Sequence, residues 1–374
     1  MTIQIRTVTT DRDRMQWIDF PYRLYHKVPN FIPQLRREQR VFFDPQRNPG
    51  FDTAKTLFLL AELDGKVVGR ICAIINALEC EKLGHKRGRF GWFESIDDQA
   101  VASALLDAVH GWLQQQQCVE MTGPHGFTDL DIEGILIDGF DALPTINGSY
   151  NFPYYSTLLE AYGLEKDVDY LDFRAVVPDR LPLFEKLRKR FAGSEYQVLT
   201  CSSRKELKQH LDDIWRLLEE SFEPLYGVVP LTAEQRAFYT DAYFDFLDPD
   251  FVKLIVRPGT GLVAFMIGIP SLSRAFQKAN GRLYPFGFLH VLKAFRKPET
   301  VDFLLAGARP GEPTTTLTAL GMIAMFDTLR DRGVQFIETN HELEENKTVH
   351  QLWSKLDRLA VRRSRIYRMD LAQP

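Results

Sequence analysis

Three side chains that could accept a proton from a substrate stand at the ends of strand-like runs. Glu94 lies near the end of the run 89–95, Glu338 ends the run 334–338, and His341 follows in a polar loop. Carboxylates and imidazoles act as general bases when they lie within hydrogen-bond reach of the reacting group. Each also has a simpler interpretation, because a carboxylate at a strand end can face solvent and a single histidine can be structural.

Two adjacent tyrosines open a predicted helix and could donate a proton. Tyr154 and Tyr155 directly follow Pro153, a residue that favours the first turn of a helix, here 152–162. Adjacent helical residues point in different directions, so at most one of the two faces any one cleft. The alternative is that these rings are packed aromatic side chains.

The loop before this helix is acidic and contains glycine and proline. Asp129, Asp131 and Asp138 follow the segment 123–125. These carboxylates could bind an amine-bearing head group, or they could cap turns of their own loop. They lack the ligand spacing of a divalent-metal loop. The cysteines form no CxxC pair either, so we predict no metal site.

The elements around these residues occur twice in the same order, and each copy runs strand, loop, asparagine, helix and strand. The first copy comprises 119–122, Asn151, 152–162 and 169–177, and the second comprises 334–338, Asn346, 347–356 and 362–371. A duplication of this kind predicts an α+β (mixed α/β) chain built from two similar units. Each unit should have a mixed, mostly antiparallel sheet flanked by helices. We place the units at 1–178 and 196–374, with a connector at 179–195.

The composition is that of a globular protein without a nucleic-acid or membrane-spanning signature. The 374 residues are 45% hydrophobic and carry a formal net charge of -4. That charge gives no electrostatic reason to expect a nucleic-acid partner. No signal peptide is visible, and the longest uncharged apolar run, 261–270, is shorter than the ~20 residues that span a bilayer. We therefore expect a cytoplasmic protein, with peripheral contact to the inner membrane as a further option.

Short sequence pieces in both halves carry a family resemblance over nearly the whole chain. They are Asn48-Pro49-Gly50-Phe51, Val68-Gly69-Arg70-Ile71, Phe90-Gly91-Trp92-Phe93-Glu94, Tyr150-Asn151-Phe152-Pro153, Tyr226-Gly227-Val228-Val229-Pro230 and Glu342-Leu343-Glu344-Glu345-Asn346. In this order they resemble a family of bacterial tandem GNAT-like proteins, which have the acyl-CoA N-acyltransferase fold. Bacterial ceramide synthases, which acylate a long-chain base, are similar to it.

The resemblance implies transfer of an acyl group from acyl-CoA, as co-substrate, to an amine. The acceptor would be a small-molecule amine or a lipid, such as a sphingoid base. Such chemistry needs a base, for which Glu94, Glu338 and His341 are the candidates, and an acid, for which Tyr154 and Tyr155 are the candidates. In the second copy Trp353 stands near the position where this fold often has its tyrosine, and an indole cannot protonate a thiolate.

The fold also needs backbone N–H groups at a helix N-terminus to hold the CoA pyrophosphate. In the first copy the corresponding segment, 94–99, has three acids and no glycine, which predicts a plain helix capped by Asp97 or Asp98. In the second copy we predict a CoA site that comprises Gly307, Ala308, Arg309, Gly311, Thr314, Thr315, Thr316 and Asn346. It lacks the usual Gly-x-Gly spacing, and two prolines remove donors, so a plain loop before a helix is the alternative.

Two other functions fit the same pattern. The incomplete pyrophosphate loops would suit a catalytically silent GNAT-like binding protein. Aminoacyl-tRNA-dependent transferases also use paired GNAT-like domains, although an acidic chain is poorly suited to tRNA. Aromatic residues concentrated in 17–51 and 222–247 could line an acyl channel or touch a membrane, or they could form ordinary cores.

Overall fold

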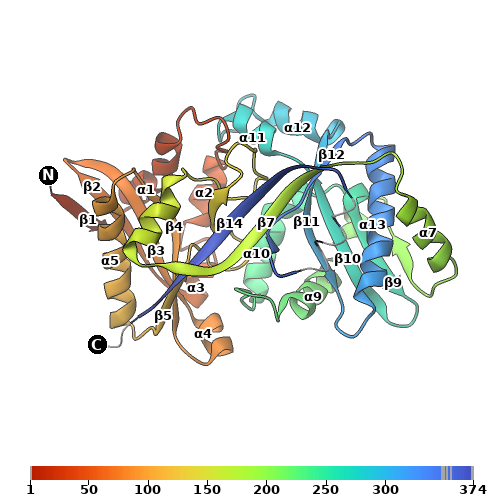
Figure 1. Cartoon of the computed structure of the whole chain (residues 1–374), viewed down its shortest axis with the longest axis horizontal. Coiled ribbons are helices and arrows are strands. Elements are labelled where there is room, and N and C mark those ends of the chain that lie inside the picture. Colours follow the sequence, from red (N-terminus) through yellow and green to blue (C-terminus); the bar gives the residue numbers. More distant parts are fainter. Residues whose placement is uncertain (1, 347–349, 351–352, 354–355, 372–374) are drawn as a thin grey trace.

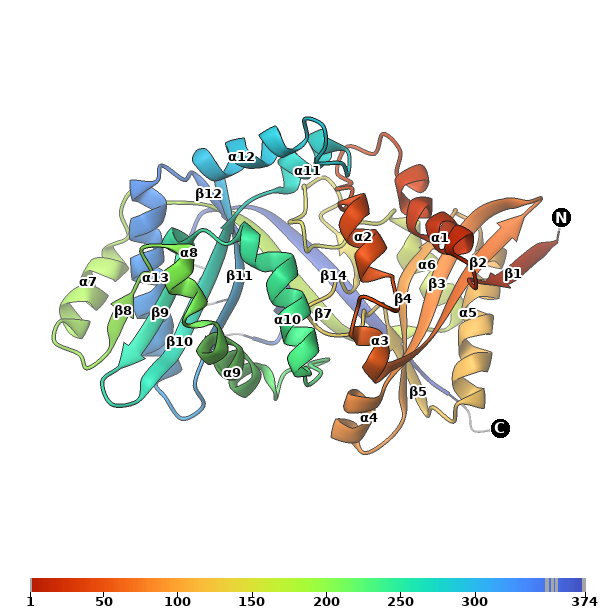
Figure 2. The ribbon, with the colours of Figure 1, turned by 180° about the vertical axis from the view of Figure 1, so that it is seen from behind.

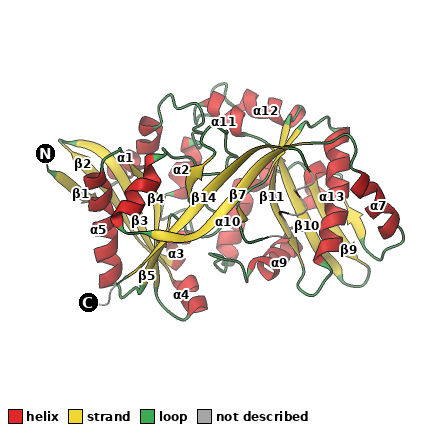
Figure 3. Ribbon diagram, in the orientation of Figure 1, coloured by secondary structure: helices red, strands yellow, loops and turns green. Residues whose placement is uncertain are grey.

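A single sheet runs through the molecule from end to end in the computed structural model, which describes residues 2–346, 350, 353 and 356–371 (Figure 1). The 14-stranded sheet has the order β1-β2-β3-β4-β5-β14-β7-β12-β11-β10-β9-β8, with β6 beside β14 and β13 beside β7. Helices cover it on both sides and near both ends (Figure 3). The fold is therefore mixed α+β, as the sequence predicts.

The first half of the chain provides seven strands and six helices of the described structure. The strands are β1 (Ile3–Thr7), β2 (Ala54–Leu63), β3 (Lys66–Asn76), β4 (Arg87–Ser95), β5 (Glu120–Gly123), β6 (Ile135–Asp138) and β7 (Glu165–Val176). The helices are α1 (Asp11–Leu24), α2 (Arg36–Phe42), α3 (Gly50–Thr53), α4 (Ala77–Leu83), α5 (Gln99–Gln115) and α6 (Tyr154–Tyr162).

The second half adds the remaining described strands and α-helices, besides two short 3₁₀ helices, η1 (Phe244–Phe246) and η2 (Pro249–Phe251). The strands are β8 (Gln197–Leu199), β9 (Val252–Arg257), β10 (Gly261–Pro270), β11 (Thr300–Ala308), β12 (Phe336–Glu338), β13 (Glu342–Leu343) and β14 (Arg358–Asp370). The helices are α7 (Pro182–Phe191), α8 (Arg204–Lys208), α9 (Leu211–Phe222), α10 (Ala233–Tyr243), α11 (Ser273–Ala279), α12 (Phe288–Arg296) and α13 (Thr314–Asp331). The helix predicted at 347–356 falls largely outside the described residues.

The two copies open their sheets in the same way. Strand β4 pairs in parallel with β5 only from Arg87 to Arg89, and β11 pairs in parallel with β12 only from Thr300 to Asp302. Beyond these short ladders the strands part, which leaves a splayed gap in each copy. The equivalence confirms that the repeat seen in the sequence is a structural repeat.

A β-bulge shapes the wall of the first gap. In the β3–β4 ladder Arg70 faces Glu94 and Cys72 faces Gly91, so the single residue between them on β3 faces two on β4. One of these two, Trp92, has a φ of 48°, in the left-handed region that bulky residues rarely occupy. A bulge re-aims the side chains that follow it. It brings Trp92, Phe93 and Glu94, three consecutive residues, to the same cavity wall.

The last strands of the two halves are exchanged across the middle of the sheet. Strand β14, at the end of the chain, pairs with β5 of the first half, and β7 of the first half pairs with β12 of the second. Strands β7 and β14 also form a long antiparallel ladder with each other, from Arg358 to Arg368 on β14. Figure 1 shows both strands crossing the centre of the molecule side by side. Helix α7 lies within the connector predicted at 179–195, and the division of the chain into two domains at that connector stays a prediction.

Separate cores form on either side of this central ladder. The first packs α5 and α6 against the sheet, and the buried residues of α5 include Val101, Leu105, Val109 and Leu113, as its helical spacing predicts. Two others lie in the second half, around α9 with β10 and around α13 with Phe173 and Trp353. Among the described residues, no helix combines the length and apolarity needed to cross a membrane.

Candidate functional site

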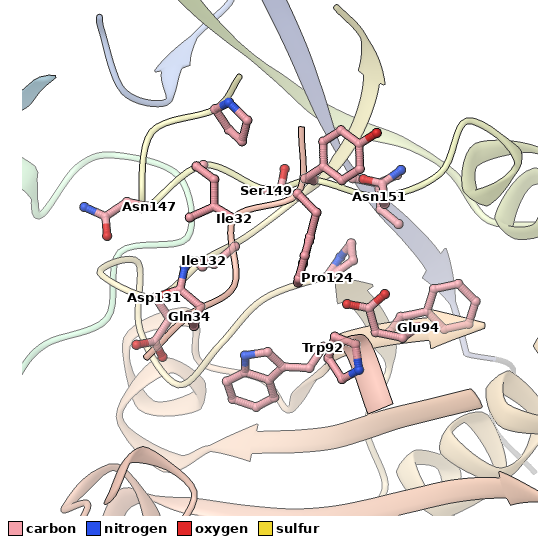
Figure 4. A pocket seen from close by; sticks show the side chains of 18 of the residues that line it. Ile32, Gln34, Trp92, Glu94, Pro124, Asp131, Ile132, Asn147, Ser149 and Asn151 are labelled. Atoms are coloured by element: carbon pink, nitrogen blue, oxygen red, sulfur yellow. The ribbon is translucent and has the colours of Figure 1, made fainter. Parts of the chain in front are cut away.

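A cavity of about 200 Å³ occupies the splayed gap of the first copy. Its walls come from the bulged part of β4, the loop 31–34, the acidic loop after β5 and the loop 144–151 before α6 (Figure 4). Glu94 and Tyr155 both line it. Tyr154 is not among its lining residues, so of the two tyrosines only Tyr155 reaches this cavity, in line with the expectation that at most one would.

Glu94 is held by three side chains from three other elements. Its Oε2 accepts hydrogen bonds from the Tyr25 hydroxyl at the end of α1 and from the Tyr155 hydroxyl, the latter at 2.8 Å. The guanidinium of Arg70 lies 3.7 Å from Oε1. Tyr155 also accepts a hydrogen bond from the backbone N–H of Ser95, at 3.0 Å. The carboxylate is therefore fixed in orientation at the cavity wall.

This environment prepares Glu94 to take up a proton. Burial raises the pKa of its carboxyl above the ordinary value, and the opposing effects of Arg70 and of the two phenols are smaller. Burial and the Glu94 charge together raise the pKa of Tyr25 and of Tyr155 well above the usual range. The phenols thus stay protonated as donors to Glu94, and a carboxylate with a raised pKa is the stronger base.

Tyr25 and Arg70 belong to this cluster but were not among the residues predicted for the site. The sequence offers only weak signals for them: Tyr25 is one of several aromatic residues in 11–28, and Arg70 lies in a piece that carries the family resemblance. Arg70 also donates to the Trp17 carbonyl at 3.0 Å, and its guanidinium lies over the Trp17 ring. Only the register of β3 against β4 reveals that it faces Glu94.

A second cavity, of about 140 Å³, occupies the equivalent region of the second copy. Helices α9 and α10 and strands β10 and β11 form one part of its wall, which is predominantly apolar, and Figure 2 shows α9 and α10 beside these strands. Leucine, isoleucine and aromatic side chains line it: Leu207, Leu211, Ile214, Trp215, Leu218, Phe244, Leu247, Ile267, Leu304 and Leu305. A wall of this kind suits a hydrocarbon chain.

The two cavities adjoin, because Asp131, Asn147 and Tyr243 line both of them. Asp131 accepts hydrogen bonds from the backbone N–H of Phe127 at 2.7 Å and from the Tyr239 hydroxyl at 2.9 Å. Burial raises the pKa of Asp131 to about 7, although these donors act against it. Asp131 therefore caps a turn of its own loop, one of the two roles considered from the sequence, and its carboxylate lies at the wall that the cavities share.

His341 lies in the wall of the second cavity, between two acids. Its Nδ1 is 3.3 Å from Asp172, its Nε2 is 3.2 Å from the Glu133 carbonyl, and its ring stacks on Tyr170. Burial alone would lower the pKa of His341, but Asp172 and Glu133 together outweigh it and the pKa rises to about 8. The imidazole is therefore charged and paired at neutral pH.

Glu338 lies at the end of β12, 6% exposed, and lines neither of these two cavities. It forms an ion pair of 2.9 Å with Arg174 and neighbours the buried Asp302 in the parallel ladder. Burial raises the pKa of both carboxyls, and the nearby Glu338 charge further raises the pKa of Asp302. Of the three candidate bases, Glu94 and His341 thus line one of these two cavities and Glu338 lines neither.

Comparisons with known proteins agree with the architecture. No family model matches the chain. It is 27% identical over 379 residues to protein YghO of Escherichia coli K12, covering 98% of this chain and 95% of YghO. It is 26% identical over 293 residues to the bacterial ceramide synthase of Caulobacter vibrioides, covering 78% of this chain and 76% of that protein. A tandem GNAT protein from the clavulanic acid biosynthesis pathway superposes with a TM-score of 0.55 at 12% identity, over 99% of each chain.

The chain is a tandem GNAT-fold protein. The loop predicted to hold CoA in its second GNAT copy joins β11 to α13. Gly307 packs closely, since a Cβ there would meet the Ser221 hydroxyl at 2.5 Å. The Arg309 guanidinium lies 3.6 Å from Glu220, and Gly311 has a φ of 85°. Ala308 ends β11, and Asn346, in the exposed loop after β13, lies outside this segment.

The first turn of α13 is open to solvent at its N-terminus. Thr314 and Thr315 are exposed and Thr316 is partly so, and no side chain among the described residues caps this helix. The nearby Glu312 is turned away, because it binds Arg257 at 3.0 Å and the Tyr196 hydroxyl at 2.9 Å. An 18-residue helix with an uncapped start can bind an anion.

The equivalent helix of the first GNAT copy has no such opening. Asp98 caps α5 by accepting from the backbone N–H of Ala100 at 2.8 Å and of Val101 at 3.4 Å. The prediction of a helix capped by Asp97 or Asp98 is confirmed. A carboxylate already occupies the N–H groups that a pyrophosphate would need, so the two copies differ in what they can bind.

Proposed function

We propose that this protein is an acyl-CoA-dependent N-acyltransferase that joins a long-chain acyl group to an amine, with a sphingoid long-chain base as the preferred acceptor. The observation that carries the proposal is the pair of adjoining cavities, one ending at Glu94 and the other lined by hydrocarbon side chains. The similarity to a bacterial ceramide synthase over 78% of the chain supports the choice of acceptor.

The acceptor amine binds in the first cavity, within reach of Glu94. An amine attacks a thioester only when its nitrogen is uncharged, so a proton must leave it. Glu94, with a pKa raised by burial, takes that proton directly or through a water molecule. Tyr25 and Tyr155 hold the carboxylate in position by donating to the same oxygen.

The donor binds along the second copy. Its phosphates lie at the open N-terminus of α13 near Arg309, and its acyl chain enters the second cavity. Strand β11 supports this path, because it lines the cavity through Leu304 and Leu305 and then leads directly into the loop before α13. The thioester carbonyl then lies near the shared wall at Asp131.

The reaction forms one C–N bond and breaks one C–S bond. The amine nitrogen attacks the thioester carbonyl, the C–S electron pair leaves with sulfur, and the products are an amide and CoA thiol. A charged amine loses two protons on its way to the amide. Glu94 takes the first before the attack, and the second, released as the C–N bond forms, passes through solvent to the departing thiolate. Positioning two bound substrates together accounts for much of the rate in such transfers.

The test uses sphinganine with palmitoyl-CoA or acetyl-CoA, and it measures amide by mass spectrometry and CoA by thiol release. We expect N-palmitoyl product, with palmitoyl-CoA strongly preferred. Equal use of acetyl-CoA would contradict the role of the second cavity. Absence of amide with sphinganine and with simple long-chain amines would reject the proposal.

A second function, binding of acyl-CoA without turnover, is favoured by one feature of the same loop. Arg309 already faces Glu220, and Pro310 and Pro313 have no N–H to offer. Under this alternative, calorimetry would detect acyl-CoA binding while neither amide nor free CoA appears with any amine. Product formation would exclude it.

A further inference from the structure

Large apolar side chains are exposed together on one surface of the second half. Tyr284 is 74% exposed and Phe286 71%, both in the loop before α12, and Leu289 and Leu292 on α12 itself are 51% and 49% exposed. Phe288, which begins α12, is 38% exposed. We call these five residues the α12 surface. Single exposed apolar residues are ordinary, but a contiguous group of this size marks a binding face.

One side of α12 packs against the protein and the other side faces solvent. Val291, Ala294 and Phe295 pack against the core beneath, while Phe288, Leu289 and Leu292 face outward. No residue of α12 is fully buried. Figures 1 and 2 both place α11 and α12 along one long edge of the molecule, above the central ladder. The outward side is therefore accessible from a flat surface brought against that edge.

The segment that carries the α12 surface is strongly basic. From 271 to 299 the chain contains six cationic residues, Arg274, Lys278, Arg282, Lys293, Arg296 and Lys297, and a single acid, Glu299. All six are exposed, and none forms an ion pair with a carboxylate among the described residues. The segment thus carries +5 in a chain of net charge -4.

We propose that the α12 surface docks this protein onto an anionic lipid bilayer. Apolar and aromatic side chains insert at the headgroup level, and flanking lysines and arginines bind anionic headgroups, as in peripheral amphipathic helices. A protein partner with an acidic rim, or a second copy of this chain, would use the same exposed groups. The concentration of unpaired positive charge on an otherwise acidic chain favours a membrane.

The docked edge is tied to one wall of the first cavity. Gln277 on α11 donates to the carbonyls of Pro29 at 2.8 Å and Phe31 at 3.1 Å, and the Gly281 carbonyl accepts from the backbone N–H of Arg36 at 3.0 Å. The segment held in this way, 29–36, supplies Phe31, Ile32 and Gln34 to the cavity wall. Docking through the α12 surface would therefore bring this wall of the first cavity close to the bilayer.

The test is co-sedimentation of the full-length protein with vesicles of phosphatidylglycerol and phosphatidylethanolamine, and with vesicles of phosphatidylcholine. We expect binding to the anionic vesicles that weakens as salt increases. A double variant, Lys293→Gln with Arg296→Gln, should bind about 25-fold more weakly, since each basic residue near an anionic surface contributes about fivefold. Phe286→Ser with Leu292→Ser should weaken binding by about tenfold or more.

The matched control is Lys186→Gln with Lys189→Gln on α7, which has the same spacing and the same change of charge. Both lysines are exposed, so this variant should bind vesicles like the unaltered protein. Circular dichroism checks that every variant folds. Weak binding by all variants including the control, equal binding to both vesicle types, or no binding at all would overturn the proposal. A protein dimer that the serine variant dissociates, without vesicle binding, would assign the surface to a second copy instead.

The docking proposal rests on the proposed function only for its purpose, and experiments can refute either one without the other. Vesicle binding needs neither acyl-CoA nor Glu94, so it persists in an inactive variant if the surface is correctly assigned. Conversely, an active enzyme in detergent whose protein never binds vesicles would keep the proposed function and remove the docking.

Discussion

Replacement of Glu94 by glutamine separates catalysis from structure at the first cavity. Glutamine keeps the size of the side chain and one oxygen that can accept from Tyr25 and Tyr155, but it cannot take up a proton. General-base catalysis contributes about 10² to 10⁴ in rate, so Glu94→Gln should lower kcat by that factor, or about 3 to 5 kcal/mol of barrier. KM for the acyl-CoA should change little, since the donor binds to the other copy.

The same variant should not be less stable at pH 8. Because burial raises the pKa of Glu94 above 4.5, the folded protein binds this proton more tightly than the unfolded chain does. The contribution of this group to the free energy of unfolding is therefore greatest below the unfolded pKa, and it falls as pH rises through the folded pKa. Glutamine stays neutral throughout that window, so the Tm of the variant at pH 8 should equal or exceed that of the unaltered protein.

The assay follows amide formation from sphinganine and palmitoyl-CoA between pH 5 and 9, alongside thermal unfolding by circular dichroism. In the unaltered protein kcat should fall as pH decreases through the raised pKa of Glu94. The residual kcat of the variant should not show this decrease. Glu62→Gln on β2, where Glu62 pairs with Arg6 at 2.7 Å, is the control and should keep full activity. If Glu94→Gln retains activity within threefold while Glu338→Gln loses it, the base lies in the second copy and the reasoning is refuted.

Three further predictions concern the second copy. Since the pKa of His341 is raised from 6.5 to about 8, its pairing stabilises the fold below pH 6.5 and is lost as pH rises through 8. His341→Gln should therefore reduce the difference in unfolding free energy between pH 6 and pH 9 by about 2 kcal/mol, measured by urea denaturation, and an unchanged difference would exclude this pairing. Leu211→Trp should fill part of the second cavity and shift activity from palmitoyl-CoA toward acyl chains several carbons shorter, and an unaltered chain-length profile would place the acyl chain elsewhere. Arg309→Ala should weaken CoA binding about tenfold by calorimetry, whereas Arg216→Ala, on the exposed side of α9, should not; equal affinities in both would move the phosphate site.

Features encoded by a few neighbouring residues were predictable from the sequence. The Asp64-Gly65 turn closes β2 onto β3 with φ of 50° and 73°, as expected for a two-residue hairpin. Helix α5 begins at its aspartate cap and buries the expected face. Both signals depend on spacing within one element, so no knowledge of distant residues was needed.

Features that depend on distant pairing were not predictable. The alternation of β14 indicates which residues share a face but not which strand lies beside it, so its insertion between β5 and β7 could not be foreseen. The bulge at Trp92, which creates the Glu94 cluster with Arg70, likewise requires the register of two strands. Helices α11 and α12 were not predicted, because both are short and the stretch that separates them contains Gly281, Pro285 and Gly287, which are typical of a loop.

Because β7 and β14 are exchanged between the halves, the first cavity depends on residues from both ends of the chain. Tyr367 and Leu371, from the last strand and the residue after it, are buried in the core of the first half, and the Tyr367 hydroxyl donates to Glu160 of α6 at 3.0 Å. Helix α6 carries Tyr155, so the final strand supports the element that orients Glu94. A fragment that ends near residue 178 would leave the edge of β5 without β14, its antiparallel partner in this sheet. Residues at the far end of the sequence thus help to support the wall of the first cavity. The β7–β14 ladder, to which β14 contributes, also joins the two halves in which the adjoining cavities lie.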